Sequence, residues 1–476
     1  MPVDLISRLP PELLIQVFEE FLVESSTFRV LTPLLCITSV CAHWRSVAIA
    51  SPALWTRVYY GPRSTPYGRM PAPDIHEWAV IFLERSRSAP LEVFLESTFW
   101  DPAANNGPAR EEKKQLWWKA FDLLVPHLHR CHDLTIRTMH VDARRLWGSL
   151  RSIEFKLLKH FSFQDVDEDQ SSPPYTWFTA ATSNINDFRL TCGSLKYLQI
   201  TSRNPQTLQP IPIAGSLRYL HLVVFTMGQW WDNVILSLGE LPALHHLSVM
   251  FTGPELSFRW DMERRAELPN LESLETNFPL FSVNLRTPRL AELMLRGLSL
   301  DRWSEITRTE AYRRHRWPHP ALHSNMSGIQ SLSRFTLTDC EIEWVGIGPY
   351  SAIQMTDGGE ILTKMMASMG EIPVDTLEFI GCDGIEGTLR RLASPTNSVN
   401  ARMGGGAGGT SHNDADVYAT RNPPYLLPNL QRLVVTPNLS PLEDSVAEAV
   451  AELSRGRPTL TIEQGKRMVW YEGHDI

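Results

Sequence analysis

The chain has 476 residues, of which 43% are hydrophobic and 21% are charged. This composition is that of an ordinary globular protein; it excludes a wholly disordered chain, and the length allows a large core without disulfides or metals. The formal net charge of −8 argues against a nucleic-acid-binding protein, which normally carries a basic surplus.

The first predicted element is an amphipathic helix that begins at Leu9-Pro10-Pro11-Glu12. Proline suits the first helical turn, and a carboxylate there faces the positive end of the helix dipole. Apolar residues then recur at helical spacing as Leu13, Leu14, Val17, Phe18, Phe21 and Leu22. The pattern therefore predicts one face that packs against other residues.

A second helix is predicted from about Pro33, and Pro52 prevents it from continuing. Its apolar residues are Leu34, Ile37, Val40, Cys41, Trp44, Val47 and Ala48. Leu54, Trp55 and Val58 follow as a last apolar anchor. A core of about 50 residues is too small to be robust alone, so we expect these helices to pack against a larger domain. A helical cap on the end of that domain is the simplest structural interpretation.

These residues also resemble a known motif. Leu9-Pro10-x-Glu12-Leu13-Leu14-x-x-Val17-Phe18, Leu34-Leu35-x-Ile37-x-x-Val40-Cys41-x-x-Trp44-Arg45 and Pro52-x-Leu54-Trp55 occur in the order of the F-box. The resemblance implies a three-helix module at residues 1–60 that docks on the Skp adaptor of Skp–cullin–F-box ubiquitin ligases. Its core and adaptor-binding face would comprise Leu9, Pro10, Leu13, Leu14, Val17, Phe18, Leu34, Ile37, Val40, Cys41 and Trp44. The segment from Glu19 to Pro33 is longer than in the compact motif and resembles the loop common in fungal F-box proteins.

Residues 61–120 are interpreted as a linker followed by a first helix–strand unit, with a helix at 76–87 and a strand at 90–95. A second pair follows, with a helix at 117–130 and a strand at 133–136. This alternation predicts an α/β fold with repeated units.

A template of the form apolar-x-x-apolar-x-apolar recurs ten times from residue 131 to residue 435. Its matches are Cys131/Leu134/Ile136, Leu150/Ile153/Phe155, Leu195/Leu198/Ile200, Leu217/Leu220/Leu222, Leu244/Leu247/Val249, Leu271/Leu274/Thr276, Leu290/Leu293/Leu295, Leu332/Phe335/Leu337, Val374/Leu377/Phe379 and Leu430/Leu433/Val435. Residues 121–470 therefore resemble an irregular leucine-rich-repeat solenoid. An ordinary α/β domain with exposed strand ends is the alternative.

Two segments interrupt the array. The glycine-rich stretch 394–424 is predicted to be a disordered insertion, and residues 307–327 are interpreted as a further insertion. Near the end of the chain, an amphipathic helix is predicted at 441–455 and a short strand at 459–462.

No catalytic, cofactor or metal motif is found in the sequence. The glycine run lacks a preceding strand and a following Gly-Lys-Ser/Thr, so it does not fit a phosphate-binding loop. His127, His129, Cys131 and His132 are the densest group of ligand-type residues, but they lack paired zinc spacing. We therefore expect a protein that is not an enzyme and that holds no cofactor or metal.

The resemblance implies a substrate-recognition subunit whose repeats bind an unknown target protein and whose F-box binds the Skp adaptor and, through it, a cullin. A scaffold that binds the adaptor outside a cullin ligase is the alternative. Residues beside the strand leucines would line the target-binding face: Tyr197, Gln199, Tyr219, His221, His246, Glu275, Glu292, Arg296, Arg334 and Arg432. Each of them also fits an ordinary solvated strand position.

The six cysteines are sparse, which is typical of reduced and buried thiols. No window reaches the roughly 18 apolar residues of a membrane-spanning helix, and the first residues lack the charge pattern of a signal peptide. These features predict a cytoplasmic or nuclear protein without a membrane or nucleic-acid partner.

Overall fold

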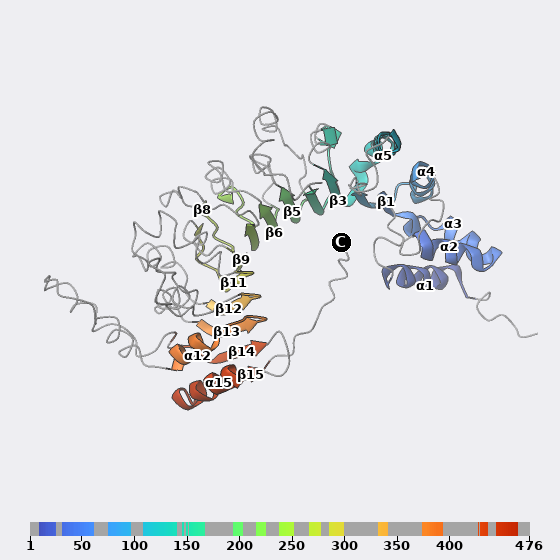
Figure 1. The fold of residues 1–476 in the computed structure, drawn as a ribbon. Helices are drawn as coiled ribbons and strands as arrows, with labels where there is room; N and C mark the ends of the chain where they lie inside the picture. Colours follow the sequence, from blue (N-terminus) through green and yellow to red (C-terminus); the bar gives the residue numbers. More distant parts are fainter. Residues whose placement is uncertain are drawn as a thin grey trace, which may run out of the picture. The chain divides into compact units, whose positions relative to one another are not determined.

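The computed structural model describes part of the chain (Figure 1). The described residues are 9–24, 31–60, 75–96, 108–139, 145–146, 149–150, 152–166, 194–202, 216–224, 238–251, 266–277, 285–298, 332–340, 374–393, 427, 429–436 and 444–464. They belong to two compact units that divide between Arg218 and Tyr219. No helix in these ranges combines the length and the apolar character that crossing a membrane requires.

The first unit begins with three helices and a short 3-10 turn, as the F-box resemblance implies. They are α1 (Pro11–Glu24), α2 (Leu31–Val40), α3 (Ala42–Ala50) and η3 (Pro52–Trp55). The prediction of a single helix from Pro33 to Pro52 is wrong. Cys41 has an extended backbone with φ −156° and ψ 172°, which separates α2 from α3. Its sulfur accepts a hydrogen bond from the Trp44 backbone N–H at 3.4 Å, which caps α3. The apolar pattern runs through this break because both helices face the same core.

The core of these helices is closed by aromatic side chains. The rings of Phe18 and Trp44 lie 5.0 Å apart. The indole N–H of Trp55 donates a 2.7 Å hydrogen bond to the carbonyl oxygen of Ala48, so the one polar atom of this buried ring is satisfied.

The helices pack against the first helix–strand units, as their small core leads one to expect. The next elements are β1 (Arg57–Tyr60), α4 (Ile75–Ser86), β2 (Leu91–Glu96), α5 (Pro108–Leu124) and η4 (Val125–Arg130). Phe82 of α4 meets Trp55 edge-on at 5.3 Å, and the Arg85 guanidinium lies 4.2 Å from the Trp55 ring centre. Arg57 of β1 donates a 3.2 Å hydrogen bond to the Leu22 carbonyl oxygen in α1.

The strands of the first unit form parallel pairs in chain order, β1–β2–β3–β4–β5. The last three are β3 (Cys131–Met139), β4 (His160–Val166) and β5 (Tyr197–Ser202). One buried row crosses all five strands and consists of Val58, Val93, Leu134, Phe161 and Leu198. Side chains alternate across a strand, so the neighbouring positions form a second, polar face.

The strand predicted at Leu150/Ile153/Phe155 is misplaced. The strand that follows β3 is β4. Its buried side chains come from the triplet Leu158/Phe161/Phe163, which has the same spacing as the predicted triplet and begins eight residues after it. Both triplets fit the template equally well. Only pairing with β3, through Leu134 opposite Phe161 and Ile136 opposite Phe163, distinguishes them.

The second unit also contains a parallel sheet in chain order. Its strands are β6 (Tyr219–Val224), β7 (His246–Phe251), β9 (Ser273–Thr276), β11 (Glu292–Arg296), β12 (Leu332–Thr338), β13 (Val374–Ile380), β14 (Arg432–Thr436) and β15 (Thr461–Gln464). A buried row crosses β6 to β14 and consists of Leu220, Leu247, Leu274, Leu293, Phe335, Leu377 and Leu433. These are the middle positions of the template, so the pairing keeps the predicted frame from strand to strand.

Smaller elements complete the second unit. The helices α12 (Glu386–Ala393) and α15 (Asp444–Gly456) pack against each other, and β8 (Ala266–Glu267) pairs with β10 (Leu285–Arg286). The prediction of a helix at 441–455 is confirmed by α15, and that of a closing strand by β15. The chain thus combines N-terminal helices with parallel sheet, an α/β fold.

Two buried cysteines occupy equivalent places after β12 and β13. The Cys340 thiol donates to the carbonyl oxygen of Leu295 at 3.5 Å, and the Cys382 thiol donates to that of Leu337 at 3.2 Å. Cys340, which follows β12, therefore donates to the last buried residue of β11, and Cys382, which follows β13, donates to the last buried residue of β12. The predicted insertions at 307–327 and 394–424 lie outside the described residues, and the boundaries 1–60, 61–120 and 121–470 stay predictions.

Candidate functional site

Helix α1 carries an exposed apolar stripe beside a buried one. Leu13, Val17 and Phe21 are spaced four residues apart, so they lie on one side of the helix, and they are 46%, 52% and 47% exposed. The buried stripe beside them consists of Leu14, Phe18 and Leu22. Leaving three large apolar side chains half in water is unfavourable for the isolated protein, and such an arrangement is typical of a docking surface.

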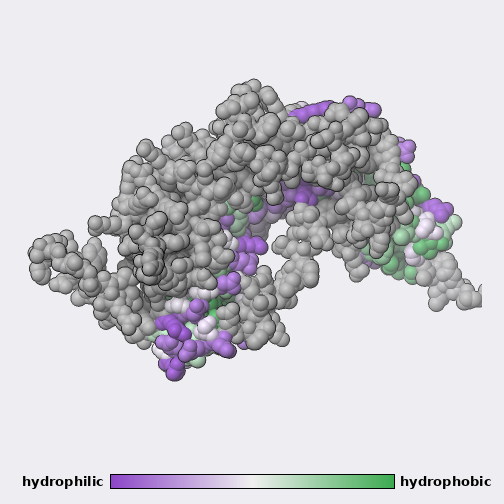
Figure 2. All heavy atoms as spheres, in the orientation of Figure 1, coloured by the Kyte–Doolittle hydropathy of each residue, from purple (hydrophilic) through white to green (hydrophobic). Residues whose placement is uncertain are grey.

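The following helices also carry exposed apolar side chains. Leu35 and Val40 of α2 and Ile49 of α3 are 44%, 58% and 40% exposed. Six of the eight large hydrophobic residues that are exposed in the described ranges therefore belong to α1, α2 and α3. Figure 2 shows hydrophobic surface at these helices. We call these six residues the apolar docking surface.

The eleven residues predicted from the F-box pattern divide between core and surface. Leu14, Phe18, Leu34 and Ile37 are buried. Pro10, Leu13, Val17 and Val40 are exposed, and Leu9, Cys41 and Trp44 are half-buried. The pattern names residues of both kinds because a helix that packs on its own core and also docks on a partner carries apolar residues on two sides.

Three members of the apolar docking surface are absent from the predicted set: Phe21, Leu35 and Ile49. The spacing of Leu13, Val17 and Phe21 is the signal that could have identified Phe21, since it continues the same stripe by one turn. Leu35 stands in the quoted F-box pattern and was left out of the predicted set. For Ile49 the sequence carries no comparable signal, because it lies in a helix with apolar residues on several sides.

The predicted target-binding residues lie on the polar strand faces of the two units. Tyr197 belongs to the first unit, where it is half-buried; burial raises the pKa of its hydroxyl, which lies 3.4 Å from the Gln199 amide oxygen. In the second unit, Tyr219 and His246 occupy paired positions of β6 and β7 and stack with ring centres 4.5 Å apart. Burial lowers the pKa of His246, which favours the neutral ring, while Glu272 opposes the shift.

The charged candidates of the second unit form ion pairs between arginine and glutamate side chains of neighbouring strands. Arg296 lies 3.6 Å from Glu275, and Arg334 lies 3.7 Å from Glu292. His221 lies near the first of these pairs; burial lowers its pKa, and Glu275 opposes that shift. The charged candidates of the second unit therefore lie on a polar strand face where arginine and glutamate side chains are paired.

Two carboxylates complete this face and are missing from the predicted set. Glu378 pairs with Arg334 at 3.6 Å, and Glu463 pairs with Arg432 through two hydrogen bonds of 3.0 and 2.6 Å. The hydrogen bonds from Arg432 lower the pKa of Glu463. Glu378 stands between the second and third apolar positions of its template match, as His221 and Glu275 do in theirs, so the frame itself could have identified it.

The ligand-type residues around position 130 do not come together. The Cys131 thiol donates to the Asp133 carbonyl oxygen at 2.8 Å within the core, and burial raises its pKa. Burial also lowers the pKa of His127, and the Nδ1 of His129 contacts the Pro126 carbonyl oxygen at 2.7 Å. His132 instead faces Glu92 on the polar side of the sheet.

Comparison with known proteins identifies one family. Residues 6–60 match the F-box-like family, and the matched range covers α1, α2, α3, η3 and β1. A search of curated proteins found none that matches the chain. The chain therefore contains an F-box-like domain at its N-terminal end, and domains of this kind generally bind the Skp adaptor.

Proposed function

We propose that this protein is the substrate-recognition subunit of a Skp–cullin–F-box ubiquitin ligase. The observation that carries the proposal is the apolar docking surface on a domain of the F-box-like family. In this role α1 presents Leu13, Val17 and Phe21 to the adaptor, while Phe18 and Trp44 hold the helix on its core. We also propose that the domain is of the fungal type, because the sequence from Glu19 to Pro33 resembles the longer loop of fungal F-box proteins.

The strand-rich remainder is proposed to be a leucine-rich-repeat-like domain that binds the target protein. Two features support this interpretation: the parallel pairing of the strands in chain order, and the buried row formed by the middle positions of the template. Such arrays present their polar strand face as an extended binding surface. Here that face carries the ion pairs of Arg296, Arg334 and Arg432.

The proposed contribution to ubiquitin transfer is proximity. A target held on the same scaffold as the ubiquitin-conjugating enzyme reacts as though it were present at a high effective concentration. The chain itself would then supply no reacting group and would require no cofactor. A cytoplasmic or nuclear location follows from this role.

Binding of the purified full chain to the Skp adaptor tests the first step. A Val17→Ala/Phe21→Ala variant should lose at least about 2 kcal/mol of binding free energy, roughly a 30-fold weaker Kd, as expected when two central apolar anchors are removed. Gln16→Ala/Glu20→Ala changes exposed polar residues of the same helix and is the matched control. Equal affinity of both variants for the adaptor would contradict docking through this surface.

Precipitation from cells separates the ligase from an adaptor-bound scaffold. The ligase role predicts that cullin comes down with the wild-type chain and is lost with the Val17→Ala/Phe21→Ala variant. Adaptor without cullin in the precipitate would favour the scaffold instead.

A further inference from the structure

A β-bulge in β3 turns two successive side chains toward the same face of the sheet. Leu91 of β2 pairs with Cys131 and Glu92 pairs with Asp133, so His132 is an additional residue in β3. Cys131 and Leu134 are buried, whereas His132 and Asp133 between them are both partly exposed. Without the bulge, alternation would direct one of the two into the core.

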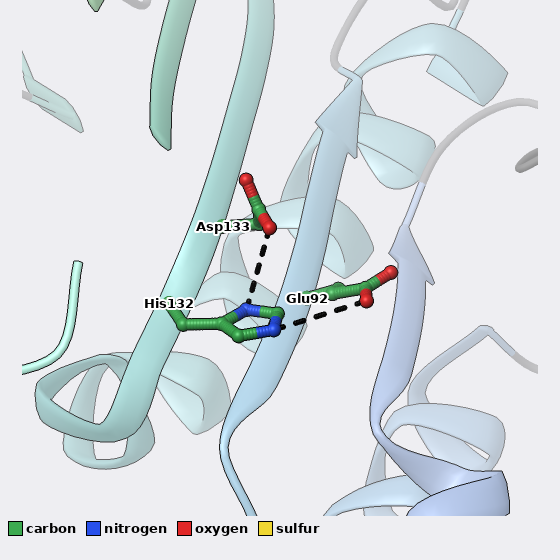
Figure 3. A group of neighbouring side chains, drawn as sticks. All are labelled: Glu92, His132 and Asp133. Atoms are coloured by element: carbon green, nitrogen blue, oxygen red, sulfur yellow. Dashed lines mark ion pairs between the residues drawn. The ribbon is translucent and has the colours of Figure 1, made fainter. Parts of the chain in front are cut away.

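The bulge brings three ligand-type side chains together on the polar face. The Nε2 of His132 lies 3.9 Å from the Oε1 of Glu92, and its Nδ1 lies 3.5 Å from the Oδ2 of Asp133. One donor atom from each residue can be chosen so that all three lie within 4.8 Å of one another. Figure 3 shows the imidazole of His132 between the two carboxylates.

The remaining oxygen of each carboxylate is held by a further side chain. Arg57 Nε lies 2.8 Å from the Oε2 of Glu92, and His160 Nδ1 lies 2.6 Å from the Oδ1 of Asp133. Both carboxylates are therefore oriented from outside, and the oxygens directed toward His132 are the ones left over. Partners of this kind orient the ligands in protein metal sites and increase their affinity.

Direct hydrogen bonds do not account for the arrangement. Both contacts of the His132 nitrogens are longer than a good N–H···O hydrogen bond, and its Nδ1 is buried without a hydrogen-bond partner. Ligand atoms about 2.0–2.2 Å from a tetrahedral zinc ion lie roughly 3.3–3.6 Å apart. The three donors lie within 4.8 Å of one another, so they would have to approach by roughly 1 Å, and the ion would take one of the two His132 nitrogens.

We propose that Glu92, His132 and Asp133 bind a zinc ion on the polar face of β2 and β3. A mixed set of one imidazole and two carboxylates fits zinc, whereas magnesium and calcium prefer oxygen ligands alone. Three protein ligands on a partly exposed face leave a fourth position for solvent. Because the ligands come from two strands, the ion stabilises their pairing beside the F-box-like domain, and Arg57 and His160 act as positioning residues.

Zinc binding by the tag-free full chain, stripped with a chelator, tests the proposal by isothermal titration calorimetry. The wild-type chain should bind one equivalent of Zn²⁺ that His132→Gln does not bind. Cobalt(II) added in place of zinc should give the visible absorption of a four-coordinate ion in the wild type only. His160→Gln should keep the site but weaken it about 10- to 100-fold, as loss of a positioning residue does.

His245→Gln is the matched control, since it removes a histidine that lies 3.2 Å from Glu272 without a second carboxylate at that contact. It should retain the full stoichiometry. Wild type and His132→Gln binding the same number of ions with equal affinity would overturn the proposal. Should His132→Gln fail to fold by circular dichroism, Glu92→Gln decides: unchanged zinc affinity there rejects the site, and loss of one equivalent supports it.

Discussion

Trp55 and Phe82 meet edge to face with ring centres 5.3 Å apart, and this contact joins the F-box-like domain to helix α4. Trp55 is the last residue of η3, which lies inside the region that matches the F-box-like family. Phe82 belongs to α4, which lies beyond that region. The Arg85 guanidinium covers the same indole ring at 4.2 Å. The small helical domain therefore obtains part of its core from the residues that follow it.

Trp55→Ala should destabilise this region strongly. The side chain is 2% exposed, so its removal leaves a large cavity and an unpaired Ala48 carbonyl oxygen. A loss of about 3–5 kcal/mol in the free energy of unfolding is expected, measured by urea denaturation with far-UV circular dichroism. Arg85→Ala should cost only about 0.5–1 kcal/mol, since it removes a cation–π contact and no core volume. Similar values for both variants would show that Trp55 is not a core residue.

Phe18→Ala should act on folding and not on the adaptor contact itself. Phe18 is 1% exposed and packs on Trp44, so truncation should cost about 3–5 kcal/mol of folding free energy. Val17→Ala, which changes an exposed neighbour, should leave the unfolding midpoint nearly unchanged. Thermal denaturation of the two variants measures the difference. A Phe18→Ala protein with wild-type stability but weakened adaptor binding would be the contrary result.

Cys41 should respond to substitution as a helix cap does. Its sulfur accepts the Trp44 N–H at 3.4 Å, and serine is a better capping acceptor than a thiol. Cys41→Ser should therefore match or exceed the wild-type stability, while Cys41→Ala should lose about 0.5–2 kcal/mol of unfolding free energy. Cys36→Ala, an exposed cysteine of α2, is the control and should change little. Chemical denaturation gives the order, and alanine equal to serine would refute the cap.

Thiol alkylation should separate the cysteines by burial. Burial raises the pKa of the Cys131 thiol, and the hydrogen bond with Cys340, together with burial, raises that of the Cys382 thiol, so little reactive thiolate of either forms in the native state at pH 8. Cys36 is exposed and should react with iodoacetamide before the buried cysteines of the described residues. Peptide mass spectrometry after brief native labelling, compared with labelling in denaturant, measures this protection. Rapid native modification of Cys131 would contradict its place in the core.

His221 should make the stability of the second unit depend on pH. Burial lowers its pKa below the ordinary value of 6.5, with Glu275 opposing the shift and Arg296 adding to it. The unfolded chain then binds the proton more readily, so the stability that His221 contributes is full above about pH 6.5 and is lost as the pH falls through the folded-state pKa. Burial lowers the pKa of His246 as well.

His221→Gln should therefore flatten the decline of the melting temperature between pH 7 and pH 5. Ser248→Ala changes the paired position on β7 without removing a titratable group and serves as the control. A pH profile of His221→Gln that parallels the wild type would show that this histidine titrates normally.

Much of the helical module could be predicted from the sequence because its signals are local. Proline and glutamate at the start of α1 and the apolar spacing after them depend on residues within a few turns of each other. The apolar periodicity did not reveal the break at Cys41 because Ile37 before it and Val47 after it are both buried in one core. In the second unit the template predicted the strands well, since strand residues alternate between a buried and a polar face.

The position of β4 was not predictable in this way. Two triplets with the same spacing stand eight residues apart, and the choice of Leu158/Phe161/Phe163 depends on pairing with β3. Such pairing joins residues far apart in the chain, and a local pattern does not contain it.

Local patterns along the chain were enough to show the resemblance to an F-box in the first 60 residues and the recurrent apolar frame of the strands after it. The tertiary structure alone decided which apolar residues became core and which became surface: Phe18 is covered by Trp44, whereas Phe21 one turn later is left half exposed. It also decided that His132 and Glu92, 40 residues apart, face each other across β2 and β3. Both results have one physical cause: burial and side-chain contacts depend on which distant segments pack or pair. The spacing of residues along the chain predicts only whether a segment can form an amphipathic helix or a strand.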